Sequence, residues 1–319
     1  MRVLSINHTI LMIAVLFFQS SGAQQITGAD KTAAIQTIAR QIAANYVNPE
    51  KGGQIASHIQ TANFKGAFNK ATTWKQFDEL VTEELKSFSH DEHLYVSNNA
   101  DLVKDLKSAQ VSAGGRVNNE SRSHTSMIQE SKVLADNIGY IKITAISITK
   151  NNLPELYSAM NSMQNTKALV IDLRDNAGGR SEVGAVLESY FLPAGTPTLQ
   201  FAARDGTVTV DSTVTWLKQK RYENPVYILV NKNTASAAEA FAFVLQQNRR
   251  AKIVGETSAG AAYMNSWYAI DDENFVSVST AAPSIPGKNI SWEQEGVRPD
   301  IRVKKGDPLD VAIREASKA

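Results

Sequence analysis

A single serine, Ser236, stands between an apolar segment at residues 225–230 and a nearly all-apolar segment at residues 237–247. The first segment is typical of a buried strand and the second of a buried helix, which places Ser236 at the start of the helix. A serine at this position commonly caps the helix with its hydroxyl group. It could also act as a nucleophile, because the unpaired backbone N–H groups of a helix N-terminus can stabilise an oxyanion.

Two glycine-bearing turns follow other segments that are typical of buried strands. Gly178 and Gly179 follow residues 167–174, and the turn at residues 255–262 follows the strand-like segment at residues 251–255. Glycines let a substrate approach the bare backbone, although an ordinary turn also uses them. If these strands are parallel, both turns and Ser236 lie along one edge of the sheet, where α/β folds hold their functional sites.

A nucleophilic serine needs a base, and the chain offers few candidates. Beyond residue 23 there are four histidines, namely His58, His90, His93 and His124. His58 lies in a helical pattern and His124 in a polar stretch, so both are expected at the surface. His90 and His93 flank two acidic residues, which could suit a metal ion, but no third ligand block follows. The chain has no cysteine, which excludes thiol nucleophiles and cysteine-ligated metals, and we predict neither a metal nor a cofactor.

Five blocks of the sequence resemble one known family. The three main blocks are KALVIDLRDNAGG at residues 167–179, VNKNTASAAEAFAFVLQQNRRAKIVGETSAG at residues 230–260 and WEQEGVRPDI at residues 292–301, with DEHLYV at residues 91–96 and NIGYIKI at residues 137–143 beside them. In this order they resemble the tail-specific, or C-terminal-processing, serine protease family, in its branch of tricorn core proteases and interphotoreceptor retinoid-binding protein modules. The resemblance implies a serine-type peptidase, a hydrolase that cleaves peptide or protein substrates.

The resemblance also implies roles for five residues. Ser236 matches the nucleophile, and the backbone N–H groups of Gly178 and Ala237 match the oxyanion hole. His93 matches the base that activates the serine. Glu293 matches the carboxylate that orients this base, which would fix the imidazole tautomer and stabilise the imidazolium as the proton moves.

Several positions leave alternatives open. His90 is a second candidate base, Glu295 is a second candidate carboxylate, and Glu92 replaces the glycine that usually precedes the family's histidine. Ala261 stands where another branch of the family carries a lysine base, so a Ser/Lys dyad is not expected. A non-catalytic module that binds a hydrophobic ligand or a peptide is the alternative function, because the same fold can carry different functions.

The elements that must position these residues fall into three stretches. Residues 24–97 show helical patterns and predict a small helical cap, and residues 98–132 are polar and predict a linker or loop. Residues 133–319 alternate strand and helix patterns, which predicts an α/β core. For this core the resemblance implies a ClpP/crotonase-like sheet with covering helices.

Two local expectations within the core can be stated by residue. Residues 181–192 are expected to form one of the covering helices, and residues 198–212 are expected to form a hairpin. The stretch between His93 and Asn137 is too short for the PDZ domain that another branch of the family carries there, so no PDZ domain is expected.

Residues 1–23 combine an early arginine, a short apolar core and small residues at their end, which is typical of a secretory signal peptide cleaved before Gln24. We therefore expect a periplasmic or secreted protein that is not stably inserted in a membrane after cleavage. The chain of 319 residues has a formal net charge of +1, which argues against a nucleic-acid partner. The sequence does not indicate an oligomeric state.

Overall fold

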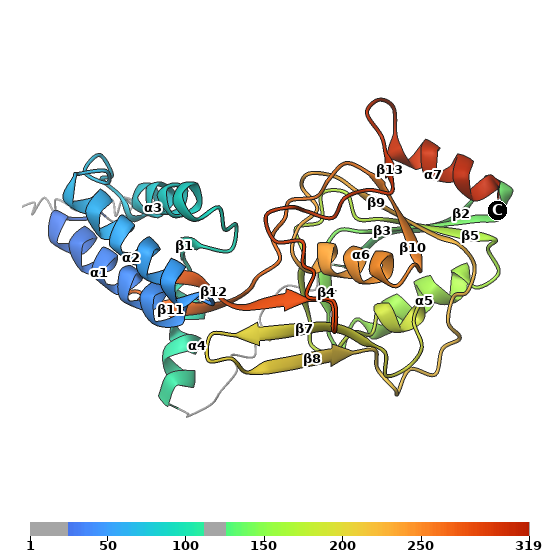
Figure 1. Cartoon of the computed structure of the whole chain (residues 1–319), viewed down its shortest axis with the longest axis horizontal. Coiled ribbons are helices and arrows are strands. Elements are labelled where there is room, and N and C mark those ends of the chain that lie inside the picture. Colours follow the sequence, from blue (N-terminus) through green and yellow to red (C-terminus); the bar gives the residue numbers. More distant parts are fainter. Residues whose placement is uncertain (1–24, 112–125, 319) are drawn as a thin grey trace, which may run out of the picture.

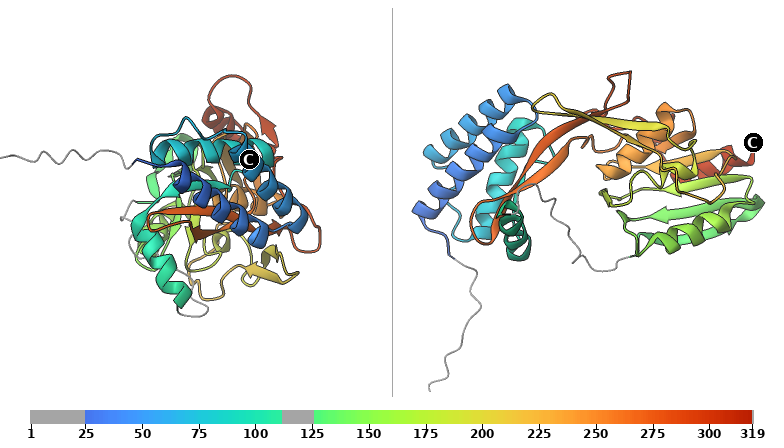
Figure 2. Two further views of the ribbon diagram at one scale, coloured as in Figure 1. Left: turned by 90° about the vertical axis from the view of Figure 1, so that its left-hand side faces the viewer. Right: turned by 90° about the horizontal axis from the view of Figure 1, so that it is seen from below.

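The computed structural model describes residues 25–111 and 126–318 (Figure 1). The signal peptide expected at residues 1–23 and His124 lie outside these residues. A helical cap occupies one end of the molecule and an α/β core the other, and long strands run between them (Figures 1 and 2). No helix among the described residues is long and apolar enough to cross a membrane.

The cap is built from three helices, α1 (Gly28–Asn45), α2 (Pro49–Phe64) and α3 (Trp74–Ser89). Each begins after a polar residue whose side chain accepts a backbone hydrogen bond, namely Thr27, Asn48 and Thr73. The helices pack through apolar side chains spaced three and four residues apart, and Ile38 and Ile42 of α1 are fully buried. The helical region expected at the N-terminal end is therefore present.

An antiparallel sheet joins the cap to the core. Its strands are β1 (Tyr95–Asn98), β7 (Pro197–Ala203), β8 (Val208–Ser212), β11 (Met264–Ala269) and β12 (Asn274–Ser284). Strand β12 pairs with β1 near its start and with β7 near its end, and its Val276 and Val278 are buried in the core of the cap. Strands β7 and β8 form the hairpin expected from the sequence.

The α/β core contains a six-stranded sheet in the order β13-β10-β9-β5-β3-β2. Its strands are β2 (Ile128–Leu134), β3 (Ile138–Ile143), β5 (Ala168–Asp172), β9 (Val226–Val230), β10 (Ala251–Gly255) and β13 (Ile301–Arg302). All neighbouring strands except β2 and β3 run parallel. Strands β5, β9 and β10 end in register, because Gly255 pairs with Val230 and Asp172 with Leu229. The turns after these three strands therefore share one edge of the sheet.

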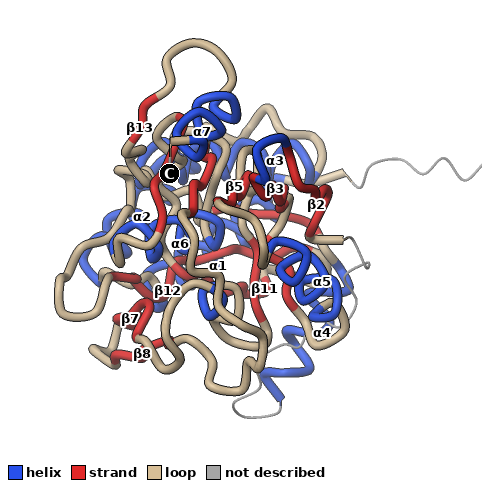
Figure 3. Tube along the Cα trace, turned by 90° about the vertical axis from the view of Figure 1, so that its right-hand side faces the viewer, coloured by secondary structure: helices blue, strands red, loops and turns tan. Residues whose placement is uncertain are grey.

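Helices cover both faces of this sheet (Figure 3). Helices α5 (Leu153–Met163) and α6 (Ala237–Gln247) contribute to the apolar core on one face, and α7 (Pro308–Ser317) packs on the other face through Ala312 and Ala316. A short parallel pair, β4 (Ile146–Ile148) and β6 (Gly179–Ser181), lies beside the main sheet. The α/β core with covering helices is confirmed.

Two segments differ from what the sequence patterns predict. Residues 181–192 do not form a helix: their start belongs to β6, Gly184 has a φ of 80°, and only the 3-10 turn η2 (Glu188–Tyr190) is helical. A residue in the left-handed region interrupts a right-handed helix.

The stretch 98–132, expected as a linker, carries helix α4 (Ala100–Val111) and strand β2. Leu102, Val103 and Leu106 of α4 are buried against Phe275 of β12. This contact gives the helix an apolar face to bury, and it could not be seen from the local polarity of the sequence.

Candidate active site

Ser236 stands immediately before helix α6, at the edge of the sheet where β9 ends. Its backbone has a φ of 54° and a ψ of −122°, an unfavourable conformation for any residue with a side chain. Its N–H donates a 2.8 Å hydrogen bond to Oε2 of Glu239. Such strain persists only where the surrounding structure enforces it, and it is found most often at functional sites.

The Glu239 side chain stabilises this turn through hydrogen bonds. Its buried carboxylate accepts four hydrogen bonds, from the backbone N–H groups of Ser236, Gly260 and Ala261 and from the hydroxyl of Ser258. Burial raises the pKa of Glu239, and the four hydrogen bonds act in the opposite direction. One carboxylate thus ties the start of α6 to the turn after β10. Glu239 was not predicted from the sequence, although the spacing S-x-x-E at the start of an apolar helix is a readable signal.

His93 reaches Ser236 from the cap, on the segment that links α3 to β1. Its Nε2 lies 3.2 Å from Oγ of Ser236. Burial lowers the pKa of His93 below its usual 6.5, and this effect outweighs the opposing negative charge of Asp91. A ring that is neutral at pH 7 can accept a proton, which is what a general base requires.

Asp91 fixes the backbone that carries His93. Its fully buried carboxylate accepts a 2.8 Å hydrogen bond from the His93 N–H through Oδ1 and a 3.0 Å hydrogen bond from the Tyr46 hydroxyl through Oδ2. Tyr46 lies at the end of helix α1, so the cap supports the histidine directly. Asp91 lies within the DEHLYV motif, but the sequence did not predict a role for it. No sequence motif points to Tyr46.

Glu293 forms no hydrogen bond with the His93 ring among the described residues. Its Oε2 accepts hydrogen bonds of 2.8 and 3.1 Å from the N–H groups of Ala262 and Tyr263. Burial, followed by the negative charge of Asp91, raises the pKa of Glu293 to about 7. Nδ1 of His93 is buried and has no hydrogen-bond partner among the described residues. The structure therefore brings Ser236 and His93 together, and it leaves the position beside Nδ1 without the expected carboxylate.

The alternative residues lie elsewhere. The side chain of Glu295 is exposed and pairs with Arg298, and His90 is exposed in a left-handed conformation at the end of α3. His58 of α2 bonds Glu84 and stacks on Phe88.

Gly178 and Ala237 both adjoin the serine. A Cβ atom on Gly178 would stand 2.7 Å from Cβ of Ser236 and 2.8 Å from N of Ala237, so only glycine fits there. Ala237 is the first residue of α6, where backbone N–H groups have no intrahelical acceptor. The N–H of Gly178, in contrast, donates a 2.9 Å hydrogen bond to Oδ1 of the buried Asn176.

A cavity of about 430 Å³ opens over the serine. The residues that line it come from the cap and from all three strand-ending turns: Glu92, His93, Ala177, Lys232, Ala235, Ser236, Ala259 and Ala261. Four of these are alanines, which leave room beside the hydroxyl group.

Two family models match the chain. One is described as peptidase family S41 and matches residues 137–303, and the other as the N-terminal domain of peptidase S41 in eukaryotic IRBP and matches residues 26–131. The carboxy-terminal processing protease CtpA of Bacillus subtilis is 25% identical over 279 residues, which cover 84% of this chain and 57% of that protein. The chain spans about half the length, or less, of the curated relatives it matches first.

Solved structures share the fold. The photosystem II D1 C-terminal processing protease superposes with a TM-score of 0.57 at 16% identity, covering 90% of this chain and 96% of that chain. The tricorn protease superposes with a TM-score of 0.58 at 13% identity, covering 91% of this chain and 37% of that chain. At these identities the likeness concerns the fold alone.

Proposed function

The chain belongs to peptidase family S41, and from that premise we propose that it is a serine-type peptidase in which Ser236 attacks the peptide bond and His93 acts as the general base. The observation that carries this proposal is the 3.2 Å contact between Nε2 of His93 and Oγ of Ser236, on a strained turn that opens into a cavity. Both groups lie within the reach that proton transfer requires.

The reaction would proceed by acyl transfer. Oγ of Ser236 attacks the carbonyl carbon while Nε2 of His93 takes the hydroxyl proton, and the tetrahedral oxyanion lies at the start of α6. The N–H of Ala237 donates a hydrogen bond to this oxyanion. The N–H of Gly178 donates a second one after it gives up its hydrogen bond to the side chain of Asn176. His93 then returns the proton to the leaving amine, and a water molecule activated by the same ring releases the acyl group.

Glu293 is the carboxylate we propose for orienting His93. For Nε2 to accept a proton, Nδ1 must carry one, and a buried N–H without an acceptor is costly. Nδ1 lacks such a partner among the described residues, while Glu293 is partly buried close enough to Asp91 to feel its charge. A Ser-His-Glu mechanism would follow if the ionised carboxylate stabilises the imidazolium that forms during attack.

The proposed substrates are peptides or proteins that enter the cavity over Ser236. We also propose that the chain acts after export, in the periplasm or outside the cell. The support for this location is the composition of residues 1–23, and sequencing the N-terminus of the exported product would test it, with Gln24 as the expected first residue.

A covalent serine reagent tests the activity itself. A fluorophosphonate should label the protein at Ser236, and Ser236→Ala should abolish both labelling and peptide cleavage while the circular dichroism spectrum is unchanged. A protein that binds hydrophobic ligands tightly but is never labelled would instead be the non-catalytic module. Labelling at another serine would show that the nucleophile is assigned wrongly.

A further inference from the structure

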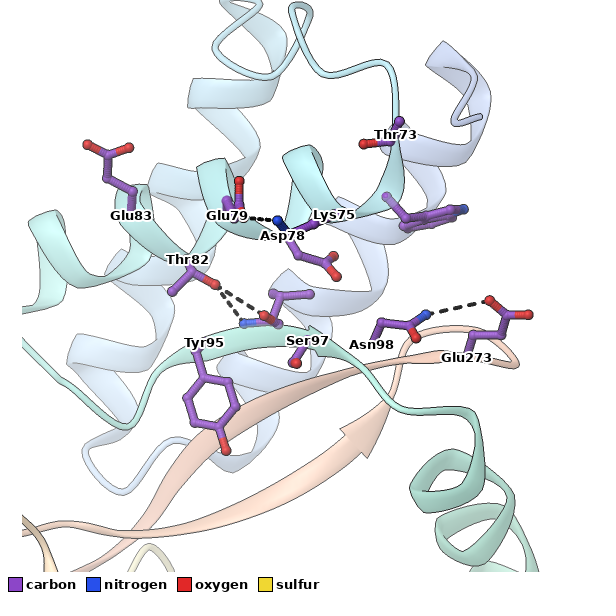
Figure 4. A pocket seen from close by; sticks show the side chains of 12 residues that line it. Thr73, Lys75, Asp78, Glu79, Thr82, Glu83, Tyr95, Ser97, Asn98 and Glu273 are labelled. Carbon is purple, nitrogen blue, oxygen red and sulfur yellow. Dashed lines mark hydrogen bonds and ion pairs between the residues drawn. The ribbon is translucent and has the colours of Figure 1, made fainter. Parts of the chain in front are cut away.

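A second cavity lies in the cap, and it shares no lining residue with the cavity over Ser236. It has a volume of about 860 Å³ and lies between helix α3 and strand β1 (Figure 4). We call it the α3/β1 pocket. The residues that give it its chemistry are Trp74, Asp78, Glu79, Glu83 and Glu273.

Asp78 is the unusual residue of the α3/β1 pocket. Its relative exposure is only 6%, and its Oδ1 is buried with no hydrogen-bond partner among the described residues. Figure 4 shows its carboxylate pointing from α3 into the space above β1. Buried carboxylates are almost always paired, because an unpaired charge out of water is costly. Burial, reinforced by the charges of Asp271 and Glu79, raises the pKa of Asp78 to about 7.

The other charges around the pocket are mostly negative. Glu79, Glu83 and Glu273 line it, and the one lysine of the lining, Lys75, already lies 3.4 Å from Glu79 with both side chains exposed. These charges favour a cation as the missing partner of Asp78. Across the described ranges, no three His, Cys, Asp or Glu side chains are arranged to hold a metal ion. An organic cation therefore fits better than a metal.

Apolar groups lie beside the acids. Trp74 is aromatic and Val96 is aliphatic, and both line the α3/β1 pocket. A lysine or arginine side chain combines an apolar stem with a cationic head, so it can cover such groups while the head meets a carboxylate. The free edge of β1 is less available to a peptide backbone, because the Thr82 hydroxyl accepts a 2.9 Å hydrogen bond from the N–H of Val96.

We propose that the α3/β1 pocket binds a lysine or arginine side chain of the polypeptide substrate, with the cationic head at Asp78 and the stem against Trp74. This proposal rests on the proposed peptidase function. Strand β1 starts two residues after His93. Its residues Val96–Asn98 are therefore within about 10–17 Å of His93 along the chain, at roughly 3.3 Å per residue. The recognised basic residue would accordingly lie several positions away from the cleaved bond.

A binding experiment isolates the pocket from catalysis. In full-length Ser236→Ala protein, fluorescence anisotropy would compare a neutrally labelled decapeptide that carries two lysines with the same peptide carrying glutamines. We expect the lysine peptide to bind at least about tenfold more tightly. Asp78→Asn should abolish this preference. Glu83→Gln removes an equal charge from an exposed lining residue and should change the preference less than about threefold.

Three outcomes would overturn the proposal. They are a preference for lysine that survives in Asp78→Asn, equal binding of the two peptides by the Ser236→Ala protein, and displacement of the lysine peptide by free cadaverine at the peptide's own concentration. The last would make the ligand a free diamine and not a peptide side chain.

Cleavage assays separate this proposal from the proposed function. With Ser236 intact, Asp78→Asn should raise KM for the lysine peptide about tenfold and leave kcat and the glutamine peptide unchanged. Lysine-dependent binding without any cleavage would refute the peptidase and not the pocket. Cleavage with no effect of Asp78→Asn would refute the pocket and not the peptidase.

Discussion

The hydroxyl of Tyr46, at the end of α1, donates a 3.0 Å hydrogen bond to the buried carboxylate of Asp91, and that carboxylate holds the backbone N–H of His93. Tyr46 is itself fully buried, and burial together with the Asp91 charge raises its pKa further above the usual value. The phenol therefore stays protonated as a donor at every ordinary pH. A residue 47 positions away in the chain thus helps to set where the base stands.

Tyr46→Phe should weaken both stability and turnover. The change leaves one oxygen of the buried Asp91 carboxylate without its donor, which we expect to cost about 1–3 kcal/mol of the free energy of unfolding. Because Asp91 holds His93, kcat should fall several-fold. Tyr263→Phe is the matched control: the Tyr263 ring lies edge-on to that of Tyr46, but its hydroxyl forms no hydrogen bond among the described residues. Equal loss in the two variants, measured by urea unfolding and peptide turnover, would contradict the support assigned to Tyr46.

Ser236→Gly and Ser236→Ala should both lose at least about 1000-fold in kcat, but they should differ in stability. The φ of 54° and ψ of −122° at this position are strained for alanine and accessible to glycine. Ser236→Gly should therefore be more stable than Ser236→Ala by about 1 kcal/mol in thermal unfolding. An alanine variant that is the more stable of the two would show that the turn stores no strain.

The sequence predicted the core strands well because they are buried on both faces. Residues 168–172, 226–230 and 251–255 are nearly unbroken apolar runs, and their parallel order brings the three turns to one edge. The helix predicted at residues 181–192 does not form, for reasons that the local hydrophobic pattern does not contain. Their start pairs with β4, and Gly184 takes a left-handed conformation. Helix α4 was missed because the apolar side chain it packs against, Phe275, is distant in sequence.

Only those residues of the site that lie in short sequence motifs could be predicted. Ser236 and His93 are 143 residues apart and yet lie in contact, as the motifs implied. Their catalytic roles, like that of Glu293, stay predictions. The bond between Tyr46 and Asp91 has no local signature, because it depends on how the end of α1 meets the segment before β1. The hydrogen bonds of Glu293 to two backbone N–H groups also depend on the folded turn and not on its motif.

The pH dependence of cleavage should distinguish His93 from Glu293. Burial lowers the pKa of His93 below 6.5, so the ring becomes protonated, and unable to accept the serine proton, only at lower pH. The pKa of Glu293 is raised to about 7, so its carboxylate ionises as the pH rises through neutrality. If the ionised form orients His93, kcat/KM should rise with pH in two steps, one below 6.5 and one near 7.

Glu293→Gln should remove the upper of these two steps and lower kcat about 100-fold. The measurement is kcat/KM between pH 5 and 9 for both proteins, and Glu295→Gln, an exposed neighbour, is the control that should leave the profile unchanged. A step near pH 7 that persists in Glu293→Gln would mean that Ser236 and His93 act as a dyad.

Glu239→Gln should damage the site although it hardly changes the size of the side chain. Each carboxylate oxygen accepts two hydrogen bonds, Oε1 from Ser258 and Gly260 and Oε2 from Ser236 and Ala261. In either orientation the new NH₂ group faces at least one backbone N–H that has lost its acceptor. We expect a loss of about 2–3 kcal/mol in urea unfolding and at least a tenfold fall in kcat. Unchanged turnover would show that the Ser236 turn holds its shape without this carboxylate.

Asp78→Asn, unlike Glu239→Gln, should stabilise the protein, and it should do so at alkaline pH. The pKa of Asp78 is about 7 in the folded state, against 3.8 for an aspartate side chain free in water, so folding holds its proton more firmly. Stability contributed by this group therefore declines as the pH rises from about 4 to 7, and the full cost, on the order of 2–4 kcal/mol, is present above 7.

The amide in Asp78→Asn carries no charge and escapes this cost, so its Tm should exceed that of the wild type at pH 8 and match it near pH 3.5. Glu83→Gln, with its exposed side chain, should show no such divergence. In Ser236→Ala protein at pH 8, the lysine decapeptide should raise the Tm more than the glutamine peptide does, and Asp78→Asn should remove this difference, because only the carboxylate gains a partner. An asparagine variant that unfolds more easily at pH 8 would mean that the Asp78 carboxylate already stabilises the folded protein, and the α3/β1 pocket would then have no unpaired charge to offer a ligand.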